Sequence, residues 1–305
     1  MDTMKDKEGN MKQEVLFLNL SQRIPTISMP ISSFCGHRLV LQTDAWDKTK
    51  YSLDFLANFS NTEQITEIMI DANVDSLQPL SLFSSLQSLA IGSKSKQELD
   101  FAVLRQLHSL SITGDFVFHN LHELSLTSLA VADTQTFPFH EINSGLQSLY
   151  LRHVGVNWEQ IDNFCSLSYL ELIRLPIQNL KGLAKITHLT ECVIAYCRKL
   201  KDFSELQNCQ SLRALELDHV KGVTTEDLSR LINLEKLILS SVGELPSIKF
   251  IELLPKLEFF SFVGTNILDG DLTPCLSLNY VGTLNKRHYN LKSDQLPYNN
   301  TSQNH

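Results

Sequence analysis

Apolar residues recur along the chain in a six-position pattern, LxxLxL, which is clearest in LQSLAI (86–91), LHSLSI (107–112) and LRALEL (212–217). Eleven such segments are spaced 19 to 23 residues apart and begin at residues 65, 86, 107, 126, 146, 167, 189, 212, 234, 257 and 278. Positions four and six are two residues apart, as in a β-strand, whereas apolar residues upstream are three apart, as in a short helical or 3-10 segment. The pattern predicts eleven repeats, each with one strand and one short helical turn.

The complete repeat reads LxxLxxLxxLxL, and its apolar positions form a stripe that a single repeat cannot bury. Stacked neighbours can bury it, and each inward side chain then contributes about 1.5–3 kcal/mol. The region 113–146 leaves an alternative open, because LHELSL (121–126) competes with LTSLAV (126–131) for the strand.

On these motifs the chain resembles the leucine-rich repeat family, whose units are about 20–29 residues long. The resemblance is closest to the short class of about 21–22 residues found in internalins and phosphatase-regulating repeat proteins, and IQNLKGLAKITHLTECVI (177–194) shows it best. It implies an α/β fold: a leucine-rich repeat solenoid, or horseshoe, with a concave parallel β-sheet and short helical or 3-10 segments on the convex side.

The ninth position of the repeat departs from the family pattern, which usually has Asn there. The residues at this position are Lys94, Asp115, Thr134, Val154, Leu175, Cys197, Val220, Val242 and Thr265. We therefore expect irregular turns after the strands rather than a continuous ladder of buried Asn side chains.

Three segments are expected from the extent of the repeat. Residues 1–50 precede it and contain two strand-like alternations, so they are interpreted as an N-terminal cap on the open end of the solenoid. Residues 51–283 form the array of about 11 units. Residues 284–305 are polar and are expected to be a flexible tail.

Composition restricts the class of protein further. The 305 residues carry a net charge of −8, include no uninterrupted apolar stretch long enough to cross a bilayer, and begin without the pattern of a signal peptide. Six cysteines are scattered without the spacing of a disulfide framework, so reduced thiols and a cytoplasmic location are expected.

Motifs for catalysis or metal binding are missing from the sequence. Phosphate-binding loops, nucleophile elbows, HExxH and CxxC are all absent, so we expect no enzymatic activity, no cofactor and no metal. His119 and His140 each lie near a Glu, but further ligands at a suitable spacing are missing, which favours surface residues over a zinc site. Cys192, Cys209 and Cys275 occupy apolar positions of the repeat, so they are interpreted as core residues.

The predicted sheet should expose positions three, five and seven of each repeat. In the early repeats these positions hold mainly Ser, Ala and other small residues. From residue 148 onward they become aromatic and charged, with Tyr150, Arg152, Tyr169, Glu171, Glu191, Glu216, Asp218, Lys236 and Phe259. Position eight adds His153, Arg174, Tyr196 and His219. Aromatic residues and Arg are enriched in binding hot spots, so these columns form the candidate protein-binding site, although any solvated sheet face also needs polar residues.

The leading hypothesis is a non-catalytic recognition module, monomeric when free, that grips a protein partner with a basic surface on its concave face. Two finer roles stay open: an immunity or inhibitor protein that neutralises a toxin, and a regulatory subunit of an enzyme such as a phosphatase. The acidic charge argues against nucleic acid as a ligand, and the lack of a basic amphipathic helix argues against a membrane.

Overall fold

The computed structural model describes residues 3–5, 11–13, 15–22, 34, 36–92 and 96–298. The chain divides into two compact units, Met1–Leu146 and Gln147–His305, which are treated separately below.

The first unit is built on a parallel sheet. In its described part the strands follow one another in chain order: β3 (Val15–Asn19), β4 (Arg38–Gln42), β5 (Glu67–Asp71), β6 (Ser88–Gly92), β8 (Ser109–Thr113) and β10 (Ser128–Thr134). Two small ribbons accompany the sheet, antiparallel β1 (Thr3–Lys5) with β2 (Met11–Gln13) and parallel β7 (Gln97–Asp100) with β9 (Phe116–His119). The connections carry short 3-10 helices: η2 (Asp54–Asn58), η3 (Thr62–Gln64), η4 (Gln78–Leu82), η5 (Leu121–Glu123) and η6 (Phe139–Glu141).

The second unit repeats this plan. Its parallel sheet contains β11 (Ser148–Val154), β12 (Tyr169–Ile173), β13 (Glu191–Ala195), β14 (Ala214–Asp218), β15 (Lys236–Ser240), β17 (Phe259–Ser261) and β19 (Tyr280–Gly282). A short parallel pair, β16 (Glu244–Leu245) with β18 (Asn266–Ile267), lies outside this sheet. The helical segments are η7 (Trp158–Asn163), η8 (Leu183–Lys185), η9 (Ser204–Asn208), α1 (Thr225–Leu228), η10 (Lys249–Leu253), η11 (Thr273–Ser277) and η12 (Ser293–Gln295).

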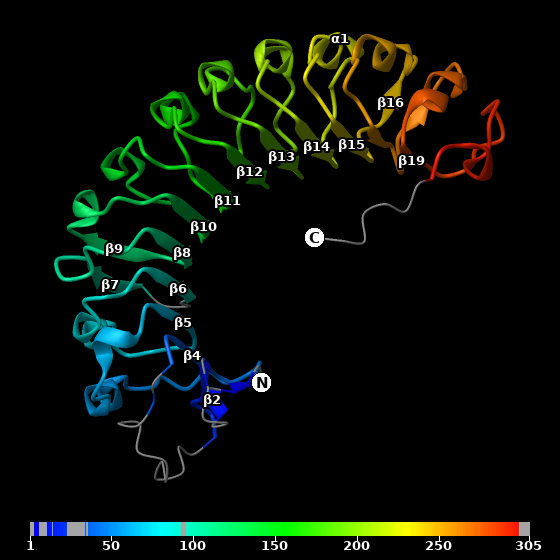
Figure 1. The fold of residues 1–305 in the computed structure, drawn as a ribbon. Helices are drawn as coiled ribbons and strands as arrows, with labels where there is room; N and C mark the ends of the chain where they lie inside the picture. Colours follow the sequence, from blue (N-terminus) through cyan, green and yellow to red (C-terminus); the bar gives the residue numbers. More distant parts are fainter. Residues whose placement is uncertain are drawn as a thin grey trace. The chain divides into compact units, whose positions relative to one another are not determined.

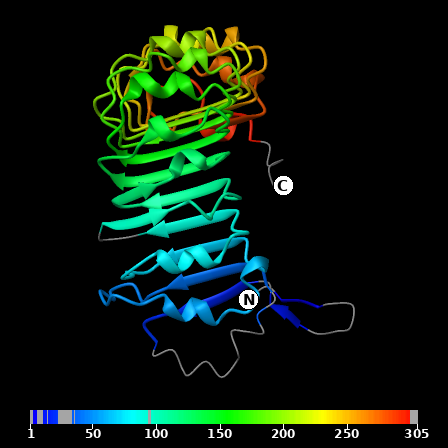
Figure 2. The ribbon, with the colours of Figure 1, turned by 90° about the vertical axis from the view of Figure 1, so that its left-hand side faces the viewer.

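Within the second unit the sheet lies on the inner side of a curve and the helical turns on the outer side (Figure 1). Figure 2 shows the strands of the first unit stacked edge to edge in the same manner. The expected fold class, a leucine-rich repeat solenoid with a concave parallel sheet and short 3-10 segments, is confirmed. In the described part of the chain no helix is long and apolar enough to cross a membrane.

The strand register is also confirmed. Each of the eleven predicted strands begins at position three of its LxxLxL segment, from Glu67 in the first to Tyr280 in the last. Within the strands, burial alternates as expected, with positions four and six buried and positions three, five and seven open to solvent to varying degrees. In the ambiguous region the strand falls in LTSLAV, because Leu121–Glu123 forms the helix η5 instead.

The first residue of the turn that follows the strand, at position eight, has a regular conformation. The expectation of irregular turns is therefore wrong for this residue. Position eight has a left-handed backbone in eight consecutive repeats, with φ between 49° and 56° at the six residues other than glycine: Gly114, Asp133, His153, Arg174, Tyr196, His219, Ser241 and Gly264. The N–H of this residue donates to the position-seven carbonyl of the next repeat, as from Tyr196 to Asp218 and from His219 to Ser240, both at 2.9 Å. This bond continues the ladder for one residue while the left-handed backbone turns the chain out of the sheet.

Position nine is filled mainly by apolar core residues instead of Asn. Val154, Leu175, Cys197 and Val220 are all 2 % exposed or less. Thr265 is buried as well, and its hydroxyl donates to the carbonyl of Leu239 at 2.6 Å. Apolar packing, with an occasional hydroxyl bond to the backbone, therefore fills the place of an Asn ladder.

The three cysteines interpreted as core residues, Cys192, Cys209 and Cys275, are buried and unpaired. Burial raises the pKa of the Cys209 and Cys275 thiols to about 12, so both stay protonated at neutral pH.

The segment after residue 283 begins with ordered contacts. Tyr289 is buried, and its hydroxyl accepts a hydrogen bond from the Ile267 N–H at 3.1 Å. Leu296 is buried too, and Tyr298 forms an antiparallel bridge with Tyr280. Residues 299–305 lie outside the described residues. The division into cap, repeat array and tail, and the tail's flexibility, stay predictions.

Candidate functional site

The exposed face of the second unit's sheet brings together most of the residues expected to bind a partner. Parallel pairing in register places residues of equal repeat position side by side, so each position forms a column across the strands. The position-three column runs Tyr169, Glu191, Ala214, Lys236, Phe259 and Tyr280, and the position-five column runs Tyr150, Glu171, Val193, Glu216 and Ile238.

One end of this face is acidic and aromatic. The Tyr169 hydroxyl donates to Glu171 Oε2 at 2.5 Å, and the pairing of the strands sets Tyr150 beside Glu171 and Tyr169 beside Glu191. Partial burial and the Glu171 carboxylate hold the pKa of Tyr169 well above its usual value, so the phenol remains a donor. Glu216 lies two strands from Glu171, about 10 Å away at the usual strand spacing.

The other end is a basic and aromatic stack. The Lys236 Nζ lies 5.5 Å from the centre of the Phe259 ring, and Phe259 stacks on Tyr280 with centroids 4.2 Å apart and planes 7° from parallel. The ring of Tyr298, which is 63 % exposed, lies 5.4 Å from that of Tyr280. The sequence argument missed both tyrosines, although Tyr280 could have been found as position three of the last repeat.

Arg152 and Asp218 occupy position seven, at the edge of the face where the strands end. Asp218 contacts the residue that follows it, since its Oδ1 lies 2.6 Å from His219 Nδ1. Asp218 therefore lies on the sheet face and also contacts the turn that follows its strand.

The position-eight side chains form a second group along this edge. The ring of Tyr196 stacks on that of His219, with centroids 4.6 Å apart and planes 12° from parallel, and the Arg174 guanidinium lies 5.8 Å from the centre of Tyr196. These three residues come from consecutive repeats, so the regular left-handed turn arranges them as a short ladder.

The formal charge of the face follows from its columns. Positions three, five and seven of the second unit contain four acids, Glu171, Glu191, Glu216 and Asp218, and two bases, Arg152 and Lys236, which gives 2 − 4 = −2. In the first unit the same positions from β6 to β10 hold only Ser, Ala, Gly and Thr. The described strands β4 and β5 of the first unit do carry charge at these positions, with Arg38, Glu67 and Asp71, so the contrast with the second unit holds for β6, β8 and β10.

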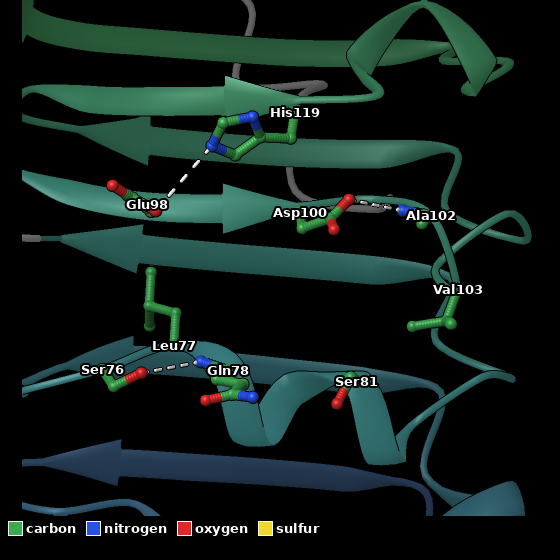
Figure 3. Close-up of a pocket in the computed structure, with 9 residues that line it drawn as sticks. All are labelled: Ser76, Leu77, Gln78, Ser81, Glu98, Asp100, Ala102, Val103 and His119. Atoms are coloured by element: carbon green, nitrogen blue, oxygen red, sulfur yellow. Dashed lines mark hydrogen bonds and ion pairs between the residues drawn. The ribbon is translucent and has the colours of Figure 1, made fainter.

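A hollow of about 610 Å³ in the first unit is a second candidate surface (Figure 3). Its polar side chains are engaged locally: Asp100 accepts from the Ala102 N–H at 2.9 Å, Ser76 Oγ accepts from the Gln78 N–H at 3.1 Å, and His119 Nε2 lies 3.8 Å from Glu98 Oε2. The first two bonds start the turns on either side, and the third links the neighbouring strands β7 and β9. Among the described residues no group of three or more His, Cys, Asp or Glu side chains could hold a metal ion.

Comparison with known proteins agrees with this architecture. Residues 143–254 match the model of the endo-beta-N-acetylglucosaminidase EndoS LRR domain. The structure of an internalin (inlF) from Listeria monocytogenes is similar at a TM-score of 0.54 and 16% identity, over 74% of this chain and 77% of that chain. The TLR13–ssRNA13 complex is similar at a TM-score of 0.54 and 16% identity, over 81% of this chain and 42% of that chain. No curated protein matches the chain in sequence.

The fold defines a solenoid built from short repeats, each with one inner strand and one outer turn. The repeat motif, the strand register and these matches together show that the chain has a leucine-rich repeat fold, and residues 143–254 match a leucine-rich repeat family model.

Proposed function

We propose that the chain is a non-catalytic recognition protein whose second unit binds a protein partner with a basic surface. The proposed contact surface consists of Tyr150, Arg152, Tyr169, Glu171, Glu191, Glu216, Asp218, Lys236 and Phe259. The observation that carries the proposal is the concentration of carboxylates and aromatic rings on one open sheet face of the second unit, while the corresponding positions of β6, β8 and β10 in the first unit hold small neutral residues.

The chemistry of the face suits protein recognition. Tyrosine supplies contact area and a hydroxyl at low entropic cost, and Tyr169 is already fixed by its bond to Glu171. A net negative face attracts a basic partner and raises its association rate, whereas it repels a phosphate backbone. The exclusion of nucleic acid remains a prediction.

A cytoplasmic site of action and a monomeric free state complete the proposal. The five described cysteines are unpaired, and four of them are buried, which is the usage expected where thiols stay reduced.

The proposal is tested by affinity purification from the native host with three baits: the natural chain, Glu171→Lys/Glu216→Lys, and the control Glu159→Lys/Glu252→Lys. Glu159 and Glu252 are exposed and lie on the helices η7 and η10 of the same unit, so both variants change the net charge equally. We expect the natural and control baits to recover a protein with a basic surface, and the Glu171/Glu216 variant to bind it at least ~100-fold more weakly.

Recovery of the same protein by all three baits with equal affinity would contradict the proposed face. Equal thermal unfolding midpoints of the three baits would show that a loss of binding reflects the surface and not the fold.

The activity of the recovered partner then separates the finer roles. An acidic face suits a protein that neutralises a basic toxin or enzyme, and such an inhibitor blocks turnover at a 1:1 ratio. A regulatory subunit instead changes substrate choice while turnover continues.

A further inference from the structure

The position-eight ladder in the second unit borders a hollow of about 380 Å³, here named the edge hollow, which is lined by Tyr196, Arg198, Lys201, His219, Lys221 and Ser241. The ladder itself explains why there is space. Arg174, Tyr196 and His219 fill position eight in three consecutive repeats, but the next two residues of the column are Ser241 and Gly264, which are small. The column therefore ends at the His219 ring.

Cations surround this space. Arg198 and Lys221 both stand two residues after the left-handed residue of their repeat, and Lys201 follows on the same turn as Arg198. All three side chains are exposed. In the part of the chain that the structure describes, no ion pair or side-chain hydrogen bond engages any of them, in contrast to Arg213, whose Nη1 lies 2.5 Å from Glu235 Oε1.

The histidine adds an oriented polar atom. The Asp218 carboxylate lies 2.6 Å from His219 Nδ1, and the ring is held flat against Tyr196. Because Nδ1 is engaged by Asp218, Nε2 is the ring nitrogen left to meet a ligand. The edge hollow thus combines three unengaged cations with an imidazole whose position is fixed on two sides.

We propose that the edge hollow binds a phosphate monoester, with the phosphate among Arg198, Lys201 and Lys221 and the organic part of the ester near His219 and Ser241. A monoester carries close to two negative charges at neutral pH and offers three acceptor oxygens, which suits several convergent cations. A carboxylate or a phosphodiester carries only one charge and matches them less well. The volume is in the range of small-ligand sites.

The ester has two possible sources with the same chemistry, a free small molecule or a phosphorylated side chain of a protein. Calorimetric titrations with phenyl phosphate and with a phosphotyrosine hexapeptide distinguish them, because added peptide contacts tighten binding only if the natural ligand is a protein. Benzoate and dimethyl phosphate serve as singly charged comparison ligands.

The matched variants are Lys201→Gln/Lys221→Gln and the control Lys181→Gln/Lys199→Gln. Lys181 and Lys199 are exposed in the same unit and do not line the edge hollow, so both variants lose the same formal charge. We expect phenyl phosphate to bind the natural and control chains equally and the Lys201/Lys221 variant at least ~10-fold more weakly.

Binding of benzoate or dimethyl phosphate as tightly as phenyl phosphate would overturn the monoester. Equal binding to both variants, or no binding to the natural chain at millimolar ligand, would overturn the site. These titrations use no protein partner, so they succeed or fail independently of the proposed function.

Discussion

The residue at position eight, directly after the strand, has a left-handed backbone in eight consecutive repeats, and residues other than glycine adopt this conformation only at a cost in free energy. A left-handed residue other than glycine costs about 1–2 kcal/mol relative to the right-handed region. Two repeats avoid this cost with Gly114 and Gly264, whereas Arg174, Tyr196 and His219 accept it in consecutive repeats. The same conformation recurs at position eight of all eight repeats, so the backbone cost belongs to the repeat and not to the ladder alone.

The sequence could not predict this ladder. No single residue type dominates position eight, where Gly and His each occur twice among the eight left-handed residues, so the shared conformation has no clear signature in the sequence. The stacking of Tyr196 on His219 also depends on the turn bringing equal positions into contact, which requires coordinates.

Substitution of Gly270 is expected to be more destabilising than substitution of Gly243, for a local steric reason. Gly270 has φ of 67°, and an added Cβ would meet the backbone carbonyl oxygen of His288. Gly243 is also left-handed, at 104°, but an added Cβ meets nothing within 4 Å. Gly243→Ala should therefore cost about 1 kcal/mol of unfolding free energy from backbone strain alone. Gly270→Ala should cost at least about 2 kcal/mol, because the segment around His288 must also move.

Chemical denaturation of the two variants measures this difference. Equal losses of unfolding free energy would show that residues 284–298 do not pack on the last repeats as described.

At the scale of the element, several helical turns are started by a short polar side chain that accepts a backbone N–H two residues later. Asn157 accepts from Glu159 at 3.2 Å, Asn179 from Lys181 at 3.1 Å and Asp202 from Ser204 at 3.0 Å. The bonds from Ser204 hold the pKa of the Asp202 carboxyl below its usual value. These turns lie between the strands of the sheet and the helical segments of the outer surface. They are local features that Asn, Asp and Ser favour.

The strands were predictable because the signal is local and repeated. Alternation alone placed the strands of the repeat array at their third positions, except around 113–146, where it left LHELSL and LTSLAV as alternatives and the helix η5 decides for LTSLAV. The helical turns were predictable in kind but not in extent, because three-residue apolar spacing fits both α and 3-10 geometry.

The strand β14 allows a direct test of register with two neighbouring residues. Leu217 is 0% exposed, whereas the side chain of Asp218 is 21% exposed. Leu217→Asp should lower the unfolding free energy by at least about 4 kcal/mol, because it buries a carboxylate in the stripe shared by adjacent repeats. Asp218→Leu should change it by no more than about 1 kcal/mol. Thermal unfolding followed by circular dichroism compares the two, and a stable Leu217→Asp variant would contradict the register.

At the scale of the whole molecule, the repeats share one backbone plan, and the proposed function depends on which residue types occupy the exposed positions of each repeat. The repeat fixes which positions are exposed in both units, but it leaves the residue types at those positions free. In the second unit they became Tyr, Glu and Lys, and in the middle of the first they became Ser, Ala and Gly.

This distribution explains how much of the candidate site could be predicted. Reading the columns found Tyr150, Glu171 and Glu216, because exposure follows from strand alternation. It did not find Tyr298, which reaches the Phe259 and Tyr280 stack from outside the repeat. Because Tyr298 lies outside the repeats, the repeat pattern of the sequence could not indicate its contact.

Hydroxyl-radical footprinting of the complex with the affinity-purified partner tests the central claim most directly. Both units carry oxidisable side chains on their sheet faces, so the first unit is an internal control, with Phe17 at 55% and Met69 at 39% exposed. We expect the partner to slow oxidation of Tyr150, Tyr169 and Phe259 severalfold and to leave Phe17 and Met69 unchanged. Protection of Phe17 and Met69 with no change at the three second-unit residues would contradict the account.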